Sequence, residues 1–118
     1  MQLSDDTIKK YPKLYYYLKV NMPQVAEVNT IVDAIQKLAG KTTRQTIQNA
    51  MKWGQGPTIK VVTNLVCSGT KAYGCYSWGS NELRIDEKMV MDFETGKGLV
   101  TTKYGKKVYL VGVTILHE

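Results

Sequence analysis

The sequence has 118 residues, of which 43% are hydrophobic and 22% are charged, as in an ordinary globular protein. No apolar run reaches the roughly 18 to 20 residues of a membrane span, and the polar residues 2–6 do not form a secretory signal. The net charge of +6 comes mainly from scattered lysines. Scattered lysines are typical of a solvated surface without a partner. If the charge does serve binding, it favours an acidic partner protein over nucleic acid, since only Arg44 and Arg84 could make bidentate contacts with bases or phosphates.

Short helices are predicted at the start of the chain. Ser4 or Asp5 is a candidate N-cap for a first helix over residues 7–10. The Tyr-Pro pair at positions 11 and 12 interrupts this helix, because proline disfavours a helical conformation in the residue before it. Residues 13–20 then form a second short helix with one apolar face.

The clearest amphipathic pattern begins at Pro23, where apolar residues recur at helical spacing as far as Leu38. Gly40 is expected to end this helix as a C-cap residue. Thr42 or Thr43 opens another helix, with Thr42 at capping-box spacing before Gln45. The Gly-Gln-Gly-Pro stretch at residues 54–57 closes it.

The apolar pattern changes to a period of two from Thr58, which predicts strands over residues 58–65, 73–78 and 82–86. In the last of these, the apolar side chains face inward and three charged side chains, those of Glu82, Arg84 and Asp86, face outward. Alternating charge is typical of a sheet edge protected against aggregation, and also of an edge strand that lines a substrate cleft.

Two cysteines, Cys67 and Cys75, flank a glycine-containing segment. Their spacing suits a disulfide across a short hairpin in an oxidising compartment, and two free, half-buried thiols are the alternative. Two cysteines and one distant histidine make a poor zinc site, because structural zinc usually takes ligands in closely spaced pairs.

Residues 108–118 form an apolar, β-branched run that propensity assigns to a buried strand, although a fully buried helix has the same pattern. Helices followed by a small antiparallel sheet and a buried terminal element predict an α+β fold in one domain over residues 1–118. The run stops at His117 and Glu118 without a polar tail, so we expect an element that is interrupted there.

An apolar segment followed by His-Glu is how an HExxH helix begins. In that motif two histidines four residues apart bind Zn²⁺ from one helical face, and the glutamate after the first acts as general base. His117 and Glu118 match the first two positions, and the second histidine would fall four residues beyond His117.

The order of features strengthens this match. Helices come first, then the Trp-Gly-Gln-Gly-Pro turn at residues 53–57, then strands that include residues 81–86, and finally Gly-Val-Thr-Ile-Leu-His-Glu at residues 112–118. This sequence resembles the zincin-like metallopeptidase toxin domains of bacterial polymorphic toxins and type VI secretion effectors. The resemblance implies that the chain is the N-terminal part of such a domain and ends at the start of its active-site helix.

The resemblance further implies a zinc-dependent hydrolase that cleaves peptide bonds, with His117 as a metal ligand and Glu118 as general base. Residues 82–86 would then lie at the edge of the cleft. A lone histidine cannot hold catalytic Zn²⁺, so we expect this chain to be incomplete and inactive without the remaining ligands. Expected partners are a peptide or protein substrate and an acidic immunity protein. Expected locations are the bacterial cytoplasm or export without a signal peptide.

A different class of function is also compatible with the residues. The chain could be a noncatalytic interaction module that binds an acidic partner protein through its basic surface or its charged strand. Partner binding that survives replacement of His117 is the property that distinguishes such a module from the peptidase.

Overall fold

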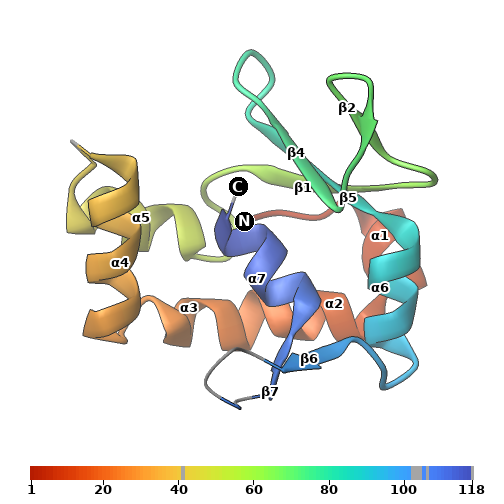
Figure 1. Cartoon of the computed structure of the whole chain (residues 1–118), viewed down its shortest axis with the longest axis horizontal. Coiled ribbons are helices and arrows are strands. Elements are labelled where there is room, and N and C mark those ends of the chain that lie inside the picture. Colours follow the sequence, from red (N-terminus) through yellow and green to blue (C-terminus); the bar gives the residue numbers. More distant parts are fainter. Residues whose placement is uncertain (41, 102–104, 106, 118) are drawn as a thin grey trace.

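The structure is a computed structural model that describes residues 1–40, 42–101, 105 and 107–117. Helices form the first part of the chain and a small sheet follows, which confirms the predicted α+β class (Figure 1). The helices of the first part are α1 (Asp5–Lys10), α2 (Pro12–Tyr16), the π-helix η1 (Tyr17–Asn21), α3 (Met22–Val25), α4 (Asn29–Ala39) and α5 (Arg44–Met51).

The predicted helix start at Pro23 is wrong. Pro23 lies inside a nearly continuous helical segment, and the widened η1 turn immediately precedes α3. Proline has no N–H to donate to the carbonyl four residues earlier, and its ring crowds that carbonyl, so a wider turn fits here. The new helix α4 begins only after Val28, whose backbone is extended at φ −85° and ψ 106°.

Helix caps agree more closely with the sequence. The Ser4 side chain accepts a hydrogen bond from the Thr7 N–H at 3.3 Å, and Gly40 ends α4 with φ 74°. The cap of α5 is Thr43, whose hydroxyl accepts from the Thr46 N–H at 3.2 Å. Of the two predicted helix starts, Thr43 is the one observed, and the capping box predicted between Thr42 and Gln45 does not form.

The central sheet has the strand order β1–β5–β4, built from β1 (Thr58–Val62), β4 (Gly74–Ser77) and β5 (Glu82–Asp86). It is mixed, because β5 pairs in parallel with β1 and antiparallel with β4, whereas the sequence predicted antiparallel strands throughout. β1 is shorter than predicted because Asn64, with φ 53°, turns the chain soon after it. Two small hairpins complete the strands: β2 (Val66–Cys67) with β3 (Thr70–Lys71), and β6 (Leu99–Thr101) with β7 (Lys107–Tyr109).

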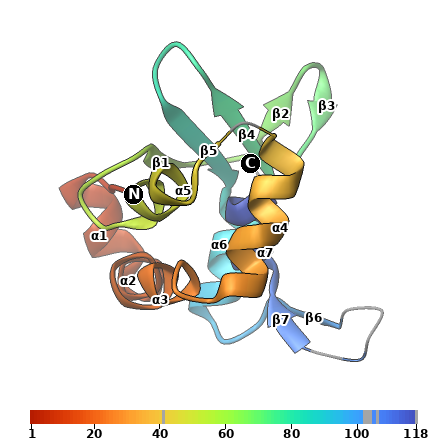
Figure 2. The same cartoon turned by 90° about the vertical axis from the view of Figure 1, so that its left-hand side faces the viewer.

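The C-terminal run divides into a short strand and a helix. After β7 the chain forms α7 (Leu110–His117), which lies between the sheet and the α2–α3 layer, beside α6 (Glu87–Glu94) (Figures 1 and 2). Burial explains the helix, since Val111, Thr114 and Ile115 are all buried and share one helical face. Val111 and Ile115 join the core cluster that also contains Leu83 and Ile85 of β5.

Candidate active-site cleft

Helix α7 is held in place along its length. Its buried Val111 and Ile115 pack in the core, and the Thr114 hydroxyl lies 3.3 Å from the sulfur of Met89 in α6. Gly112 faces η1 at a point where the Tyr17 side chain occupies the space that a Cβ would need. These contacts fix the direction in which the end of α7 points.

His117 is the last residue of α7, so its backbone is helical, as an HExxH helix requires. The His117 side chain and all of Glu118 lie outside the part of the chain that the structure describes. The position of the candidate ligand is therefore defined by the preceding turn, where Ile115 is 3% exposed and Leu116 is partly buried.

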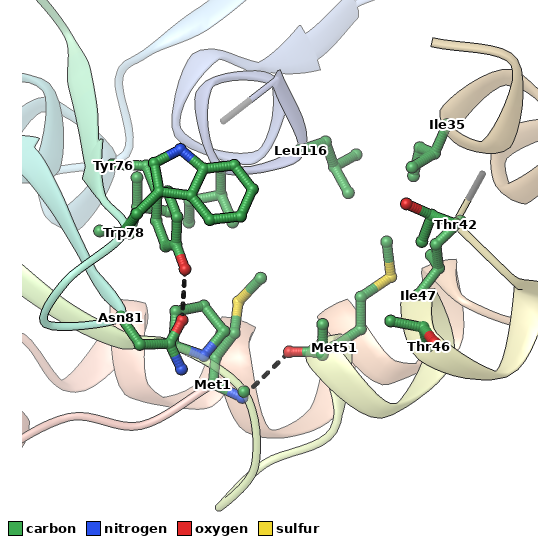
Figure 3. Close-up of a pocket in the computed structure, with 15 residues that line it drawn as sticks. Met1, Ile35, Thr42, Thr46, Ile47, Met51, Tyr76, Trp78, Asn81 and Leu116 are labelled. Carbon is green, nitrogen blue, oxygen red and sulfur yellow. Dashed lines mark hydrogen bonds between the residues drawn. The ribbon is translucent and has the colours of Figure 1, made fainter. Parts of the chain in front are cut away.

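A cleft of about 370 Å³ opens beside this turn of α7 (Figure 3). One wall is the β4–β5 hairpin with Tyr76 and Trp78, and the facing wall is formed by α4 and α5. The Tyr76 hydroxyl donates to the side-chain oxygen of Asn81 at 2.6 Å, and the Tyr76 and Trp78 rings meet edge to face at 5.4 Å. The lining residues are Met1, Ile35, Thr42, Thr46, Ile47, Ala50, Met51, Gly56, Pro57, Tyr76, Trp78, Asn81, Leu83, Ile115 and Leu116.

The α-ammonium group of Met1 lies at the floor of this cleft, beside the C-terminal end of α5. It donates to the carbonyl oxygen of Ala50 at 3.3 Å and also to those of Lys52 and Gln55. Desolvation by burial lowers the pKa of this amine to about 6. Gln2 pairs with Thr58 beside β1, which fixes the first residues against the sheet.

The charged residues of β5 do not lie where the sequence placed them. β5 is the central strand, so the prediction that Glu82, Arg84 and Asp86 form an edge strand is wrong. Because side chains alternate along a strand, these three face away from Leu83, which lines the cleft.

Each of these charged residues has contacts on the outer face of the sheet. Glu82 pairs with Lys60 at 3.1 Å, and buried Asp86 accepts a hydrogen bond from the Leu65 N–H at 3.0 Å. The Arg84 guanidinium lies 3.3 Å from the Ser77 hydroxyl. In this arrangement the three side chains stabilise the outer face and the connection that follows β1.

The chain matches the family model described as metallopeptidase toxin 3 over residues 7–118. The chain belongs to the metallopeptidase toxin 3 family. No curated protein and no solved structure matches it. Membership confirms the resemblance to metallopeptidase toxins and the assignment to a hydrolase class, and it indicates a metal and a peptide or protein target. A toxin domain also fits a bacterial effector, and no helix among the described residues is long and apolar enough to cross a membrane.

In this family member, Cys67 of β2 and Cys75 of β4 are joined by a disulfide. The bond ties the β2–β3 hairpin to the strand that precedes the aromatic wall of the cleft, since Cys75 is followed directly by Tyr76. The alternative of two free thiols does not occur in the structure. The disulfide thus connects the outer hairpin covalently to the cleft-forming strand.

The metal that a metallopeptidase needs can be tested against the residues present. A histidine at the end of a buried helix suits a first ligand. Among the described residues, however, no group of three or more His, Cys, Asp or Glu side chains is arranged to hold a metal ion. Since catalytic zinc usually takes three protein ligands, the described residues do not complete a metal site.

The cleft itself was not predicted from sequence. Tyr76 and Trp78 fall within the strand predicted over residues 73–78, and no local motif assigns a role to them or to Met1. The available signal is the alternation of side chains within β4. Tyr76 lies directly opposite inward-facing Leu83 in the β4–β5 pair, so the two side chains lie on the same face of the sheet. The convergence of that face with α5 and α7 depends on tertiary packing.

Proposed function

We propose that this chain is part of a zinc-dependent metallopeptidase toxin that hydrolyses peptide bonds beside the end of α7. The observation that carries the proposal is that His117 of this metallopeptidase toxin family member is the last residue of a helix that borders a cleft. His117 is proposed as the first zinc ligand and Glu118 as the general base. Zinc bound there would activate a water molecule for attack on the peptide carbonyl.

The proposal includes a second histidine four residues beyond His117, outside the printed sequence, because two ligands at that spacing share a helical face. A chain with one histidine supplies too few ligands for catalytic zinc. We therefore propose that residues 1–118 are the N-terminal part of the catalytic domain, and that this part is inactive by itself.

An acidic immunity protein is proposed as a partner, because the net charge of +6 would attract an acidic surface. A noncatalytic module that binds an acidic partner is the second candidate, and the same charge supports it. Release from the bacterial cell as an effector is also proposed, because a toxin domain fits such a role.

The test is proteolysis by the protein encoded by the whole natural gene, measured on denatured protein substrates. Hydrolysis should stop with a zinc chelator and in Glu118→Gln, because both remove water activation. Glu82→Gln is a matched control, since it also removes one carboxylate but on the outer face of the sheet. The noncatalytic module would be supported instead by two results together. The parent protein would hydrolyse no peptide, and both the parent and Glu118→Gln would bind the acidic partner.

A further inference from the structure

The two ends of the disulfide differ in their access to solvent. Cys67 of β2 is partly buried, whereas Cys75 of β4 is only 8% exposed. An external thiolate opens a disulfide by attacking one sulfur, and the other sulfur leaves with the electron pair. The difference in burial therefore favours Cys67 as the sulfur that is attacked and Cys75 as the one that leaves.

A guanidinium group lies beside the sulfur that would leave. Cys75 is directly opposite Arg84 in the β4–β5 pair, so their side chains share the outer face of the sheet. The Arg84 Nη2 atom is 3.8 Å from the Cys75 sulfur and 3.3 Å from the Ser77 hydroxyl oxygen. A positive charge at this position stabilises a thiolate and therefore assists its release.

The Arg84 guanidinium also has bonding capacity that its neighbours do not use. Within the described part of the chain, its buried Nε atom has no hydrogen-bond partner and no carboxylate forms an ion pair with it. Glu82, on the same face of β5, pairs with Lys60 instead. A thiolate on Cys75 would supply a negative charge beside Arg84, so the reduced state gains an interaction that the disulfide lacks.

The β2–β3 hairpin is a small element that the disulfide holds against β4. Its strands are joined through two residue pairs, and all of residues 66–71 except Cys67 are exposed. At its base Leu65 is buried, and its N–H donates to the Asp86 carboxylate at 3.0 Å. Since an isolated hairpin of this length is not stable, opening the disulfide should release residues 66–71 and leave Leu65 in place.

We propose that the Cys67–Cys75 disulfide is a redox-sensitive site that a low-molecular-weight thiol opens at Cys67, with Arg84 stabilising the Cys75 thiolate, and that its opening releases the β2–β3 hairpin. Such a bond is closed in an oxidising medium and open in a reducing cytoplasm. The proposal requires neither a metal nor peptide hydrolysis, so its test is independent of the proposed function.

The exchange takes place in two steps. In the first, a thiolate of the reductant forms a bond to the Cys67 sulfur, the S–S bond breaks, and its electron pair passes to Cys75. In the second, another thiolate of the reductant attacks the mixed disulfide and displaces the Cys67 sulfur, which takes up a proton. The two reductant molecules end as one disulfide, and the protein gains two electrons.

The role of Arg84 is tested with the protein encoded by the whole natural gene, equilibrated with mixtures of reduced and oxidised glutathione. Alkylation and mass spectrometry measure the reduced fraction of Cys67 and Cys75. Arg84→Met removes the charge at similar length and should shift the equilibrium toward the disulfide at least about threefold, as for the loss of a partly exposed ion pair. Arg84→Lys keeps a positive charge and should recover part of this shift.

Lys60→Met is the matched control, because it also removes a positive charge from the outer face of the sheet, where Lys60 pairs with Glu82. This variant should have the equilibrium of the parent protein. An unchanged equilibrium in Arg84→Met, or an equal shift in Lys60→Met, would overturn the role of Arg84.

The attacked sulfur is identified in the parent protein, so this measurement does not depend on the folding of a variant. The protein is exposed briefly to reduced glutathione, quenched with acid and mapped by mass spectrometry. Glutathione should be found on Cys67, and a mixed disulfide mainly on Cys75 would contradict the proposal.

Limited digestion with trypsin measures the release of the hairpin. Cleavage after the exposed Lys71 of β3 should become at least about tenfold faster on reduction, because a released segment is open to the protease. Cleavage after Lys60, within β1, should keep its rate. Unchanged cleavage after Lys71 would contradict release, and equal acceleration after both lysines would indicate global unfolding and overturn a local change.

Discussion

The Tyr17 side chain in η1 occupies the space where a Cβ atom on Gly112 of α7 would lie, and the ring carbon Cζ is 3.1 Å from that point. The end of the Tyr17 side chain therefore packs directly against the backbone of α7 at Gly112. Since α7 carries His117, this contact connects the packing of the N-terminal helices to the position of the candidate metal ligand.

Gly112→Ala should lower the free energy of unfolding by about 1–3 kcal/mol, because the new methyl group overlaps the Tyr17 hydroxyl and displaces the partly buried Tyr17 side chain. Urea unfolding followed by circular dichroism measures the change. Adding Tyr17→Phe should recover part of the loss. Gly79→Ala is the control, since a Cβ there meets nothing within 4 Å. A Gly112→Ala protein as stable as the Gly79→Ala protein would refute the close approach.

Glu94 caps a helix far away in sequence. Its carboxylate accepts the N–H groups of Lys13 at 3.1 Å and Leu14 at 2.6 Å, at the start of α2. Glu94→Ala should lower stability by about 0.5–2 kcal/mol, as for loss of an N-cap, and a shift in thermal midpoint measures it. Glu27→Ala removes a carboxylate at an exposed position before α4 and should change the midpoint little. Equal midpoints for both variants would argue against the cap.

The disulfide closes a short loop, with Cys67 and Cys75 separated by 8 positions. Cross-linking a loop of this size reduces the entropy of the unfolded chain and should stabilise the protein by about 2–3 kcal/mol. Unfolding with and without a thiol reductant measures this difference. A double variant with serine at both positions should be insensitive to reductant, and the idea fails if the parent protein is equally insensitive.

The buried Met1 amine should make stability depend on pH. Burial lowers its pKa from the ordinary 8.0 to about 6, so between these values the unfolded chain binds more protons than the folded one. Stability should therefore rise as pH increases from about 6 to 8 and then level off. Urea unfolding across this range measures the slope. The only histidine of the chain, His117, ordinarily titrates in the same pH range, so His117→Gln is the control. This variant should retain the slope, because the slope comes from the Met1 amine. A flat profile in this variant would contradict the assignment.

The sequence predicts features that depend on local chemistry. The Ser4 cap, the Gly40 end of α4 and the strands around Tyr76 and Leu83 all follow from neighbouring residues, and the structure confirms them. The position of β5 in the sheet did not follow, because strand order depends on contacts between distant segments. Charge alternation on β5 was a sign of its outer face and not of an edge.

The candidate site divides in the same way. The family and the His-Glu pair were recognisable, since a motif is a local signal. The helical state of residues 110–117 followed from the resemblance and not from propensity, because β-branched residues favour a strand until burial on one face of α7 decides otherwise. The cleft required α5, the β4–β5 hairpin and α7 to meet, which no single segment encodes.

The most direct test of the proposed metallopeptidase is the zinc content of the protein expressed from the whole natural gene, measured by mass spectrometry of the metal. We predict about one Zn²⁺ per chain, strong loss in His117→Ala, and retention in Glu118→Gln, because only the histidine is proposed as a ligand. Zinc content that is unchanged by His117→Ala, or no bound zinc in the parent protein, would contradict the central claim.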